Sequence, residues 1–374
     1  MLGTHGRPVR SDSSGGSAGR PRCRATKDAA EEEEPLKHLR LFAVLVAMTI
    51  VATACTGQTA SPTADEESEA PASQAPASEA AEAPDELVIG FVPSREADAL
   101  VDTIQPVADY LTEALGMPVK GVVTPDYTGL VTAMESEQAH IGAFGPFSLL
   151  QARDRAGAEI ILQSERFGSA TYHTQFMTND PDKYCDDEPV VDEETGFQNC
   201  NGTADADVGP VAEEKIGAIE AGTTVSFVEA ASASGYIFPA TIFLNNGIDP
   251  ETDIDPVFAG GHDASVIAVC EGQAEVGVSF DDARSAAETT CDVANNVVVF
   301  AYGPEIPNDG WAVLGSLPDD LKEAIKQALL DYAASEEGAA VLQEIYEIDN
   351  LVEADQDSVQ IVEDAAEQLG VTSD

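Results

Sequence analysis

Two serines lie in a run of very small residues that separates a predicted strand from a predicted helix. Ser232 and Ser234 belong to segment 229–236, which follows the β-branched residues 223–228 and precedes the apolar residues 237–244. At a helix start, free backbone N–H groups and the positive end of the helix dipole favour a bound anion, and hydroxyl groups add donors. Serine is also a common N-cap, so this segment alone does not distinguish an anion site from a structural cap.

Loops of small or polar residues also follow several other predicted strands. In open α/β sheets, ligands bind beyond the carboxyl ends of the strands. Any one of these loops is an ordinary connection, but their recurrence at the same end of the sheets predicts a binding site there. With segment 229–236, the loops are 125–127, 145–148, 260–263, 281–282 and 306–309.

These loops connect segments that alternate between strand-like and helix-like patterns. The alternation predicts an α/β fold with mainly parallel sheets, and the length of the patterned region suits two lobes. Further strands are predicted at 87–92, 119–123, 140–144, 255–259, 274–279 and 297–301, and further helices at 106–115, 127–138, 264–270 and 317–334.

The composition limits the chemistry of these loops. The formal net charge is -50, which excludes a nucleic-acid binder because such proteins need a basic surface. The charge also indicates a saline or extracellular setting and implies that an anion would be held by local hydrogen bonds. The sequence contains neither a C-x-x-C pair nor an H-E-x-x-H motif, so we expect no metal and no cofactor.

The amino-terminal region has the features of an export signal. We expect residues 1–36 to be disordered or to precede the true start codon, and residues 37–54 to form a lipoprotein signal peptide. Its apolar run, 41–54, is too short for an ordinary transmembrane helix. The segment ends in Ala-Thr-Ala before Cys55, which resembles a bacterial lipobox with Ala in place of the usual Leu. This predicts cleavage before Cys55 and lipidation of its sulfur. The alternative is a plain signal peptide with an incidental cysteine.

The segment after this cysteine is predicted to be a tether. Residues 55–85 are rich in Ala, Pro, Ser and Glu and cannot bury a core, so we expect a flexible acidic linker after the lipidated Cys55. A lipid anchor with such a linker places the folded part at the extracytoplasmic face of the bacterial cell membrane.

An acidic insertion interrupts the alternating pattern at residues 179–212. In an exported protein we expect a disulfide between Cys185 and Cys200 in this insertion, and a second between Cys270 and Cys291 around one strand–helix unit. Calcium binding is an alternative role for the insertion, but the D-x-D-x-D-G pattern of a calcium loop is absent from it.

In their order and spacing, six motifs together resemble the phosphonate/phosphite/phosphate-binding lipoproteins of ABC importers. The resemblance runs from about Glu86 to Leu351 and implies a type II periplasmic-binding-protein fold. In that fold two α/β lobes, each a mixed and mainly parallel sheet flanked by helices, enclose the ligand. The motifs are Gly-Phe-Val-Pro-Ser at 90–94, Thr-Pro-Asp-Tyr at 124–127, Gly-Pro-Phe-Ser at 145–148, Ala-Ser-Ala-Ser-Gly-Tyr at 231–236, Ala-Gly-Gly-His-Asp at 259–263 and Ile-Pro-Asn-Asp-Gly-Trp at 306–311.

The same resemblance implies domain boundaries and a function. Residues 86–175 and 303–374 would form one lobe, and residues 176–302, with the insertion 179–212, the other. The lobes would close on a phosphorus oxyanion (phosphonate, phosphite or phosphate) and deliver it to the permease and ATPase subunits of an ABC importer. The protein would act as a monomer and would not be an enzyme.

The resemblance also carries over a set of site residues, one by one. Ala233 departs from the family, which usually has Thr there, so one hydroxyl is missing while the backbone N–H remains. Asp281 is an alternative to Asp282, and Phe147 and Ser148 are further candidates. The residues implied to bind the ligand are Tyr127, Tyr172, Ser232, Ala233, Ser234, Gly235, His262, Asp282 and Asp309.

The two carboxylates, Asp282 and Asp309, suit a ligand that carries a proton. A carboxylate accepts a hydrogen bond from a P–OH group but faces an unpaired lone pair on sulfate. This predicts selectivity for a protonated phosphorus oxyanion over sulfate.

Two other functions compete with transport. Ser, His and Asp are the ingredients of a hydrolase triad, but no Gly-x-Ser-x-Gly nucleophile elbow is present. An accessory protein that presents an oxyanion to a membrane histidine kinase would have the same fold and anchor. If the protein serves transport, the sequence does not decide which ligand it binds. The candidates are phosphate, phosphite, hypophosphite, methylphosphonate, aminoethylphosphonate and an arsenic oxyanion.

Overall fold

The computed structural model describes residues 82–193, 195–205 and 209–373. The predicted leader, the signal peptide, Cys55 and nearly all of the linker lie outside these ranges, so the predictions made for them stay predictions. Within the described ranges, no helix is both long enough and apolar enough to cross a membrane.

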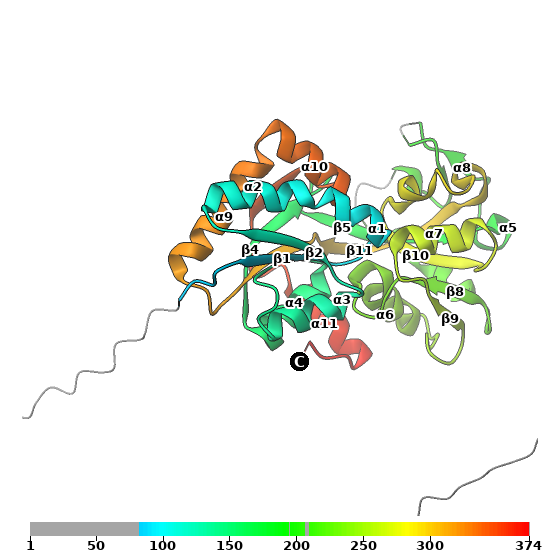
Figure 1. Ribbon diagram of the computed structural model, residues 1–374. Helices are drawn as coiled ribbons and strands as arrows, with labels where there is room; N and C mark the ends of the chain where they lie inside the picture. The colour runs from blue at the N-terminus through cyan, green and yellow to red at the C-terminus, as the bar shows by residue number, and fades with distance from the viewer. Residues whose placement is uncertain (1–81, 194, 206–208, 374) are drawn as a thin grey trace, which may run out of the picture. The chain divides into compact units, whose positions relative to one another are not determined.

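The first sheet has six strands in the order β13-β4-β12-β3-β1-β2. Strand β1 pairs in parallel with β2 and β3, whereas β12 and β13 run antiparallel to their neighbours. Helices α2, α9 and α10 cover one face, and α3, α4 and α11 the other (Figure 1). The strands are β1 (Leu87–Phe91), β2 (Val119–Val123), β3 (Ile141–Phe144), β4 (Ala158–Glu165), β12 (Gly310–Leu314) and β13 (Asn350–Glu353). The helices are α1 (Ala97–Thr103), α2 (Gln105–Leu115), α3 (Tyr127–Glu135), α4 (Pro146–Ala156), α9 (Asp319–Ala333), α10 (Glu336–Tyr346) and α11 (Gln360–Leu369).

Strand β1 illustrates why the strands of this sheet are nearly continuous runs of apolar residues. Leu87, Ile89 and Phe91 are fully buried, as expected of a strand covered on both faces by helices. Gly90, on the opposite face, lets α3 pack closely, since a Cβ atom there would lie 2.1 Å from Leu130 Cδ1. The carboxyl end of β1 is thereby fixed beneath the start of α3.

The second sheet has seven strands in the order β6-β7-β11-β5-β10-β8-β9. Strands β8, β9 and β10 run parallel to one another, whereas β5 is antiparallel to both β10 and β11. The strands are β5 (Thr171–Thr178), β6 (Val190–Val191), β7 (Gln198–Asn199), β8 (Thr224–Phe227), β9 (Asp255–Phe258), β10 (Val276–Phe280) and β11 (Val298–Pro307). The helices are α5 (Pro181–Tyr184), α6 (Phe238–Asn245), α7 (His262–Cys270) and α8 (Val293–Asn296), with short turns η1 (Thr203–Asp205), η2 (Glu213–Ala218), η3 (Ala233–Ile237) and η4 (Ala283–Ala287).

Two crossover segments join the sheets and lie side by side. The first, 166–170, links β4 to β5, and the second, 308–309, links β11 to β12. Asn308 N donates to Ala170 O at 2.8 Å, and the main chain of Asp309 accepts from Ser164 N at 2.9 Å. Two mixed, mainly parallel sheets joined in this way confirm the predicted fold class.

The expected lobe boundaries differ slightly from the observed change of sheet. Positions 175/176 and 302/303 fall inside β5 and β11, whereas the chain changes sheet just before β5 and just after β11. The reason is that β5 and β11 pair along almost their whole lengths, so neither strand is divided between lobes.

Both expected disulfides, Cys185–Cys200 and Cys270–Cys291, are formed. The acidic insertion is more than a solvated loop, because β7 pairs with β11 and extends the second sheet. Among the described residues, no group of three or more His, Cys, Asp or Glu side chains is arranged to hold a metal ion.

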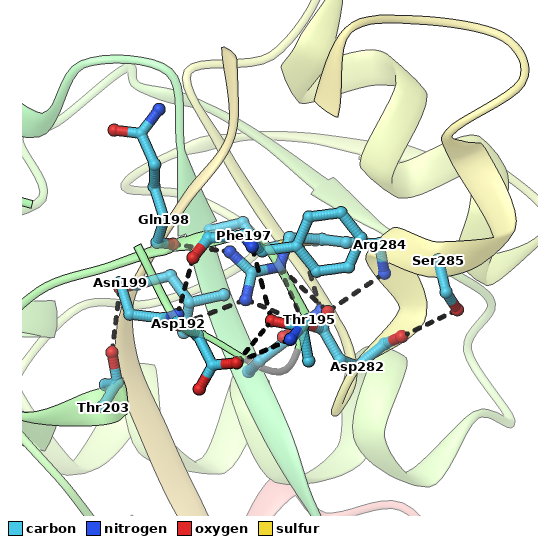
Figure 2. A network of polar contacts seen from close by, with 12 residues as sticks. Asp192, Thr195, Phe197, Gln198, Asn199, Thr203, Asp282, Arg284 and Ser285 are labelled. Carbon is cyan, nitrogen blue, oxygen red and sulfur yellow. Dashed lines mark hydrogen bonds and ion pairs between the residues drawn. The ribbon is translucent and has the colours of Figure 1, made fainter. Parts of the chain in front are cut away.

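A buried arginine attaches the insertion to the body of the second lobe (Figure 2). Arg284 Nη1 donates to Gln198 O at 2.5 Å, and Nη2 donates to Asn199 Oδ1 at 3.1 Å. The guanidinium carbon lies 4.8 Å from the ring centroid of Phe197. Asp282 completes the network by pairing with the same guanidinium.

Candidate ligand-binding site

A small cavity lies between the two lobes. It leaves about 20 Å³ for the centres of water molecules, little more than one such molecule needs. Both lobes and both crossover segments contribute to its lining, which comprises Val92, Ser94, Arg95, Tyr127, Gly145, Pro146, Arg166, Tyr172, Ser232, Ala233, Ser234, His262, Phe280, Asp309 and Tyr346. Seven of the predicted residues therefore meet at one place: Tyr127, Tyr172, Ser232, Ala233, Ser234, His262 and Asp309.

The small-residue segment forms a helix start, as predicted. Ser232 is the N-cap, and its Oγ accepts from Gly235 N at 3.1 Å. The first N–H groups of a helix have no carbonyl partner within it; here they belong to Ala233 and Ser234, which line the cavity. The first turn is a π-turn that runs directly into α6.

Proline at position 239 explains this irregular start. Pro239 has no N–H to donate to the carbonyl of Gly235, four residues earlier. That carbonyl instead accepts from Val228 N at 3.1 Å, which ties the helix start to the end of β8. The proline thus fixes the position of the helix start within the fold.

His262 presents one ring nitrogen to the cavity as a hydrogen-bond donor. Its Nδ1 accepts from Phe280 N at 3.4 Å and lies 2.9 Å from Ser279 Oγ. This network assigns the proton of the neutral ring to Nε2, which lies 3.5 Å from Ser232 Oγ. Burial, with the positive charges of Arg166 and Arg95, lowers the pKa of His262 to about 3, so the ring is neutral at physiological pH.

Two tyrosines complete the set of neutral donors. Tyr127 and Tyr172 are buried in the cavity wall. Burial, reinforced by the charge of Asp309, raises the pKa of both hydroxyl groups above the ordinary value. Both therefore keep their protons and can donate to an anionic oxygen.

Asp309 lines the cavity, but it already has a partner. Its Oδ2 forms an ion pair with Arg166, and the two residues come from the two adjacent crossover segments. Burial raises the pKa of the Asp309 carboxyl, and Arg166 opposes that rise. Oδ1 faces the side of Gly145, where a Cβ atom would lie 3.9 Å away.

The other predicted carboxylates lie outside the cavity lining. Asp282 pairs with the buried Arg284, and its side chain also caps the turn η4 through Arg284 N. Asp281 accepts from His173 N at 2.8 Å and contacts His173 Nδ1 at 2.9 Å. Both carboxylates thus have structural partners, which the loop's position in the sequence did not reveal.

Three further candidates also have structural roles. Phe147 is buried inside α4, and Ser148 Oγ donates to Gly145 O at 3.0 Å. Gly235 packs beneath the helix start, where a Cβ atom would lie 2.4 Å from Val228 Cβ. None of the three belongs to the residues that line the cavity.

Sequence analysis missed two cations and a tyrosine. Arg95 and Arg166 line the cavity, as does Tyr346, whose hydroxyl donates to Val92 O at 2.5 Å. The net charge led to the expectation of an anion held by local hydrogen bonds, and that expectation did not single out these two local cations. A signal was available for Arg95, since the chain has only 18 Lys and Arg against 68 Asp and Glu and this arginine follows the predicted strand 87–92.

The two lobes touch at the rim of the cavity. Tyr127 N, at the start of α3, donates to Glu229 Oε2 of the second lobe at 3.1 Å. His262 N, at the start of α7, donates to Ser94 O of the first lobe at 3.0 Å. These contacts link the lobes through the loops that carry the site.

A cavity lined by hydrogen-bond donors between two such lobes is typical of solute-binding proteins, and comparison with known families agrees. Residues 89–359 match the family described as "ABC transporter, phosphonate, periplasmic substrate-binding protein". The match covers well over half of the chain, and the chain belongs to this family. Its members are extracytoplasmic binding proteins of transporters rather than enzymes.

Two curated relatives illustrate the family. The phosphate-import protein PhnD of Mycolicibacterium smegmatis is 25% identical over 257 residues, which cover 65% of this chain and 66% of that protein. The phosphonates-binding periplasmic protein of Escherichia coli is 22% identical over 262 residues, 69% and 70% of the two chains.

Two solved structures confirm the type II periplasmic-binding-protein fold. A binding-protein component of an ABC phosphonate transporter from Pseudomonas aeruginosa has a TM-score of 0.61 at 21% identity, covering 75% of this chain and 85% of its own. PhnD1 from Prochlorococcus marinus, in complex with methylphosphonate, has a TM-score of 0.63 at 16% identity, covering 76% and 98%.

Proposed function

We propose that this protein binds a phosphorus oxyanion (phosphonate, phosphite or phosphate) between its lobes and delivers it to the permease of an ABC importer. Membership of the family supports the transport role. The relatives support the ligand class, because by name one imports phosphate and another binds phosphonates. The second candidate, a sensor for a membrane kinase, has no observation in its favour.

One observation carries the proposal: three kinds of donor converge on one small cavity. The helix start at Ser232 supplies N–H groups and hydroxyls, and His262 supplies Nε2–H. Tyr127 supplies a hydroxyl from the first lobe, and Tyr172 supplies one from β5 of the second sheet. Preorganised neutral donors around a helix N-terminus are suited to a tetrahedral oxyanion.

Selectivity against sulfate depends on Asp309 alone, since Asp282 lies outside the cavity. Asp309 uses Oδ2 for Arg166 and keeps Oδ1 for the ligand. A P–OH group donates to that oxygen, whereas sulfate, which carries no proton at neutral pH, meets it with a lone pair. The carboxylate thus disfavours sulfate without any change in cavity size.

The proposal is tested by calorimetric titration of the purified protein with phosphate, phosphite, methylphosphonate and sulfate. We expect at least one phosphorus compound to bind with a dissociation constant in the micromolar range or below, and sulfate to bind at least tenfold more weakly. Asp309→Asn should narrow that difference. Equal affinity for sulfate would refute the assigned role of Asp309, and no binding of any phosphorus compound would refute the function.

We also propose that the protein is held at the membrane through a lipid on Cys55. Membrane fractionation of cells that express the wild-type protein and Cys55→Ser provides the test. The wild-type protein should sediment with membranes and the variant should be released. Equal distribution of the two would contradict the anchor while leaving the binding function intact.

A further inference from the structure

Two arginines share the cavity of a protein that has few cations. The guanidinium carbons of Arg166 and Arg95 lie 5.5 and 6.0 Å from the ring centroid of Phe280, which also lines the cavity. Both positive charges also contribute to the lowered pKa of His262, so their field reaches this residue of the cavity wall. The arginines are therefore part of the surroundings of any bound ligand.

Arg166 has an incomplete set of hydrogen bonds. Its side chain is 8% exposed, and its Nη2 pairs with Asp309 Oδ2. Its Nε is buried and has no hydrogen-bond partner among the described residues. A buried donor on a charged group is costly to leave unpaired, so an acceptor atom of a ligand is the natural partner for this nitrogen.

Arg95 adds a second cation near Phe280. Its Nη2 lies 3.0 Å from Glu347 Oε2, and Glu347 does not line the cavity. The cavity wall therefore carries two guanidinium groups and one carboxylate, Asp309, and that carboxylate is already paired. An ammonium group on a ligand would meet two like charges and would compete with Arg166 for Asp309.

We infer that Arg166 determines specificity by donating Nε to the ligand and by occupying Asp309, so that the site accepts phosphorus oxyanions without a cationic substituent and rejects aminoalkylphosphonates. This inference rests on the proposed function and narrows its ligand class. Phosphate, phosphite and methylphosphonate fit the site, whereas 2-aminoethylphosphonate does not.

The test is the ratio of the dissociation constants for 2-aminoethylphosphonate and methylphosphonate, measured by calorimetry on the full chain. We expect methylphosphonate to bind the wild-type protein at least tenfold more tightly. Arg166→Gln should lower the ratio at least fivefold, because Asp309 becomes free to pair with the ammonium group. Arg153→Gln is the matched control: Arg153 pairs with Asp154 on α4, outside the cavity lining, and its loss should leave the ratio unchanged.

The outcomes separate this inference from the proposed function. If no phosphorus compound binds the wild-type protein, the function fails and the inference falls with it. If 2-aminoethylphosphonate binds as tightly as methylphosphonate, only the inference is overturned. An unchanged ratio in Arg166→Gln also overturns it. If that variant does not fold, Arg166→Lys serves instead: it should keep the rejection of the ammonium compound through its charge, and loss of that rejection would contradict the inference.

Discussion

The second lobe and the crossover region each contain a buried arginine paired with an aspartate. In the second lobe, Arg284 donates Nε to Asp282 Oδ1 at 2.9 Å, Nη2 to Asp282 Oδ2 at 2.7 Å and Nη1 to Gln198 O at 2.5 Å. In the crossover region, Arg166 pairs with Asp309 through Nη2 and keeps a buried Nε without a partner among the described residues.

The difference between the two pairs distinguishes a structural network from a binding site. Every nitrogen of the Arg284 guanidinium has an acceptor within the protein, and Arg284 does not line the cavity, so this pair holds the acidic insertion in place rather than binding a ligand (Figure 2). Arg166 lines the cavity, and its buried Nε has no partner among the described residues. Both pairs consist of a buried arginine and an aspartate. They differ in whether every guanidinium nitrogen has a hydrogen-bond acceptor within the protein.

Removal of Arg284 should have the largest effect on stability. Arg284→Met leaves Asp282 without its partner and releases the insertion, so we expect the free energy of unfolding to fall by at least about 2 kcal/mol. Urea denaturation measures this loss, and calorimetry on the folded variant should give nearly wild-type ligand affinity. A large loss of affinity in a stable Arg284→Met protein would contradict the structural role.

Removal of Arg166 should show the opposite pattern. Arg166→Met should weaken methylphosphonate binding by about 1.5–3 kcal/mol, the usual cost of a lost hydrogen bond to a charged group. The loss of unfolding free energy should be smaller than in Arg284→Met, because the carboxylate of Asp309 can regain water when the lobes separate. Wild-type affinity in Arg166→Met would remove the distinction between the two pairs.

Two serines with the same capping geometry allow a finer comparison. Ser232 caps the helix start at the cavity, and Ser335 caps α10, where its Oγ accepts from Gly338 N at 2.9 Å, away from the cavity. Either change to Ala should cost about 1 kcal/mol of stability. Only Ser232→Ala should also weaken ligand binding, by at least about 1 kcal/mol. Equal binding by both variants would indicate that Ser232 is merely a cap.

The contribution of His262 to stability should be the smallest effect at neutral pH and should appear only as the pH falls. Its folded-state pKa of about 3 lies below the unfolded value of about 6.5, so the unfolded chain binds more protons between these values. Stability should therefore fall as the pH decreases from about 6.5, and His262→Gln should lessen that dependence in urea titrations at several pH values. Ligand affinity above pH 5 should show no titration of this ring. An identical pH profile in the variant would contradict its burial as a neutral group.

The sequence allowed prediction of the α/β fold and much of the cavity wall. The helix start at Ser232 and the strand ends near Tyr127 and His262 depend on local patterns and on the alternation of elements, so they could be located in advance. Strands β4 and β5 were not predicted, and the first crossover segment, 166–170, lies between them. That gap explains why Arg166, which lies in the first crossover, was missed.

The roles of the carboxylates could not be predicted for a different reason. Asp282 and Asp309 both follow strand ends, and nothing local shows which arginine each will meet. Asp309 meets Arg166 across 143 positions of sequence, whereas Asp282 meets Arg284 two residues away. The Asp309 pair depends on how the two crossover segments pack together. The Asp282 pair is local, but its role depends on the hydrogen bond from Arg284 to Asn199, which joins the pair to the insertion.

The central claim, that the ligand occupies the cavity between the lobes, is tested most directly by calorimetry on Gly145→Ala. A Cβ atom at this position would lie 3.5 Å from Tyr127 Cε1 and 3.9 Å from Asp309 Oδ1, so it fits the free protein but takes space from the ligand. Gly145 has φ -66 and ψ 159, which alanine adopts without strain. We predict at least tenfold weaker binding of methylphosphonate with an unchanged melting temperature of the free protein; unchanged affinity would contradict the claim.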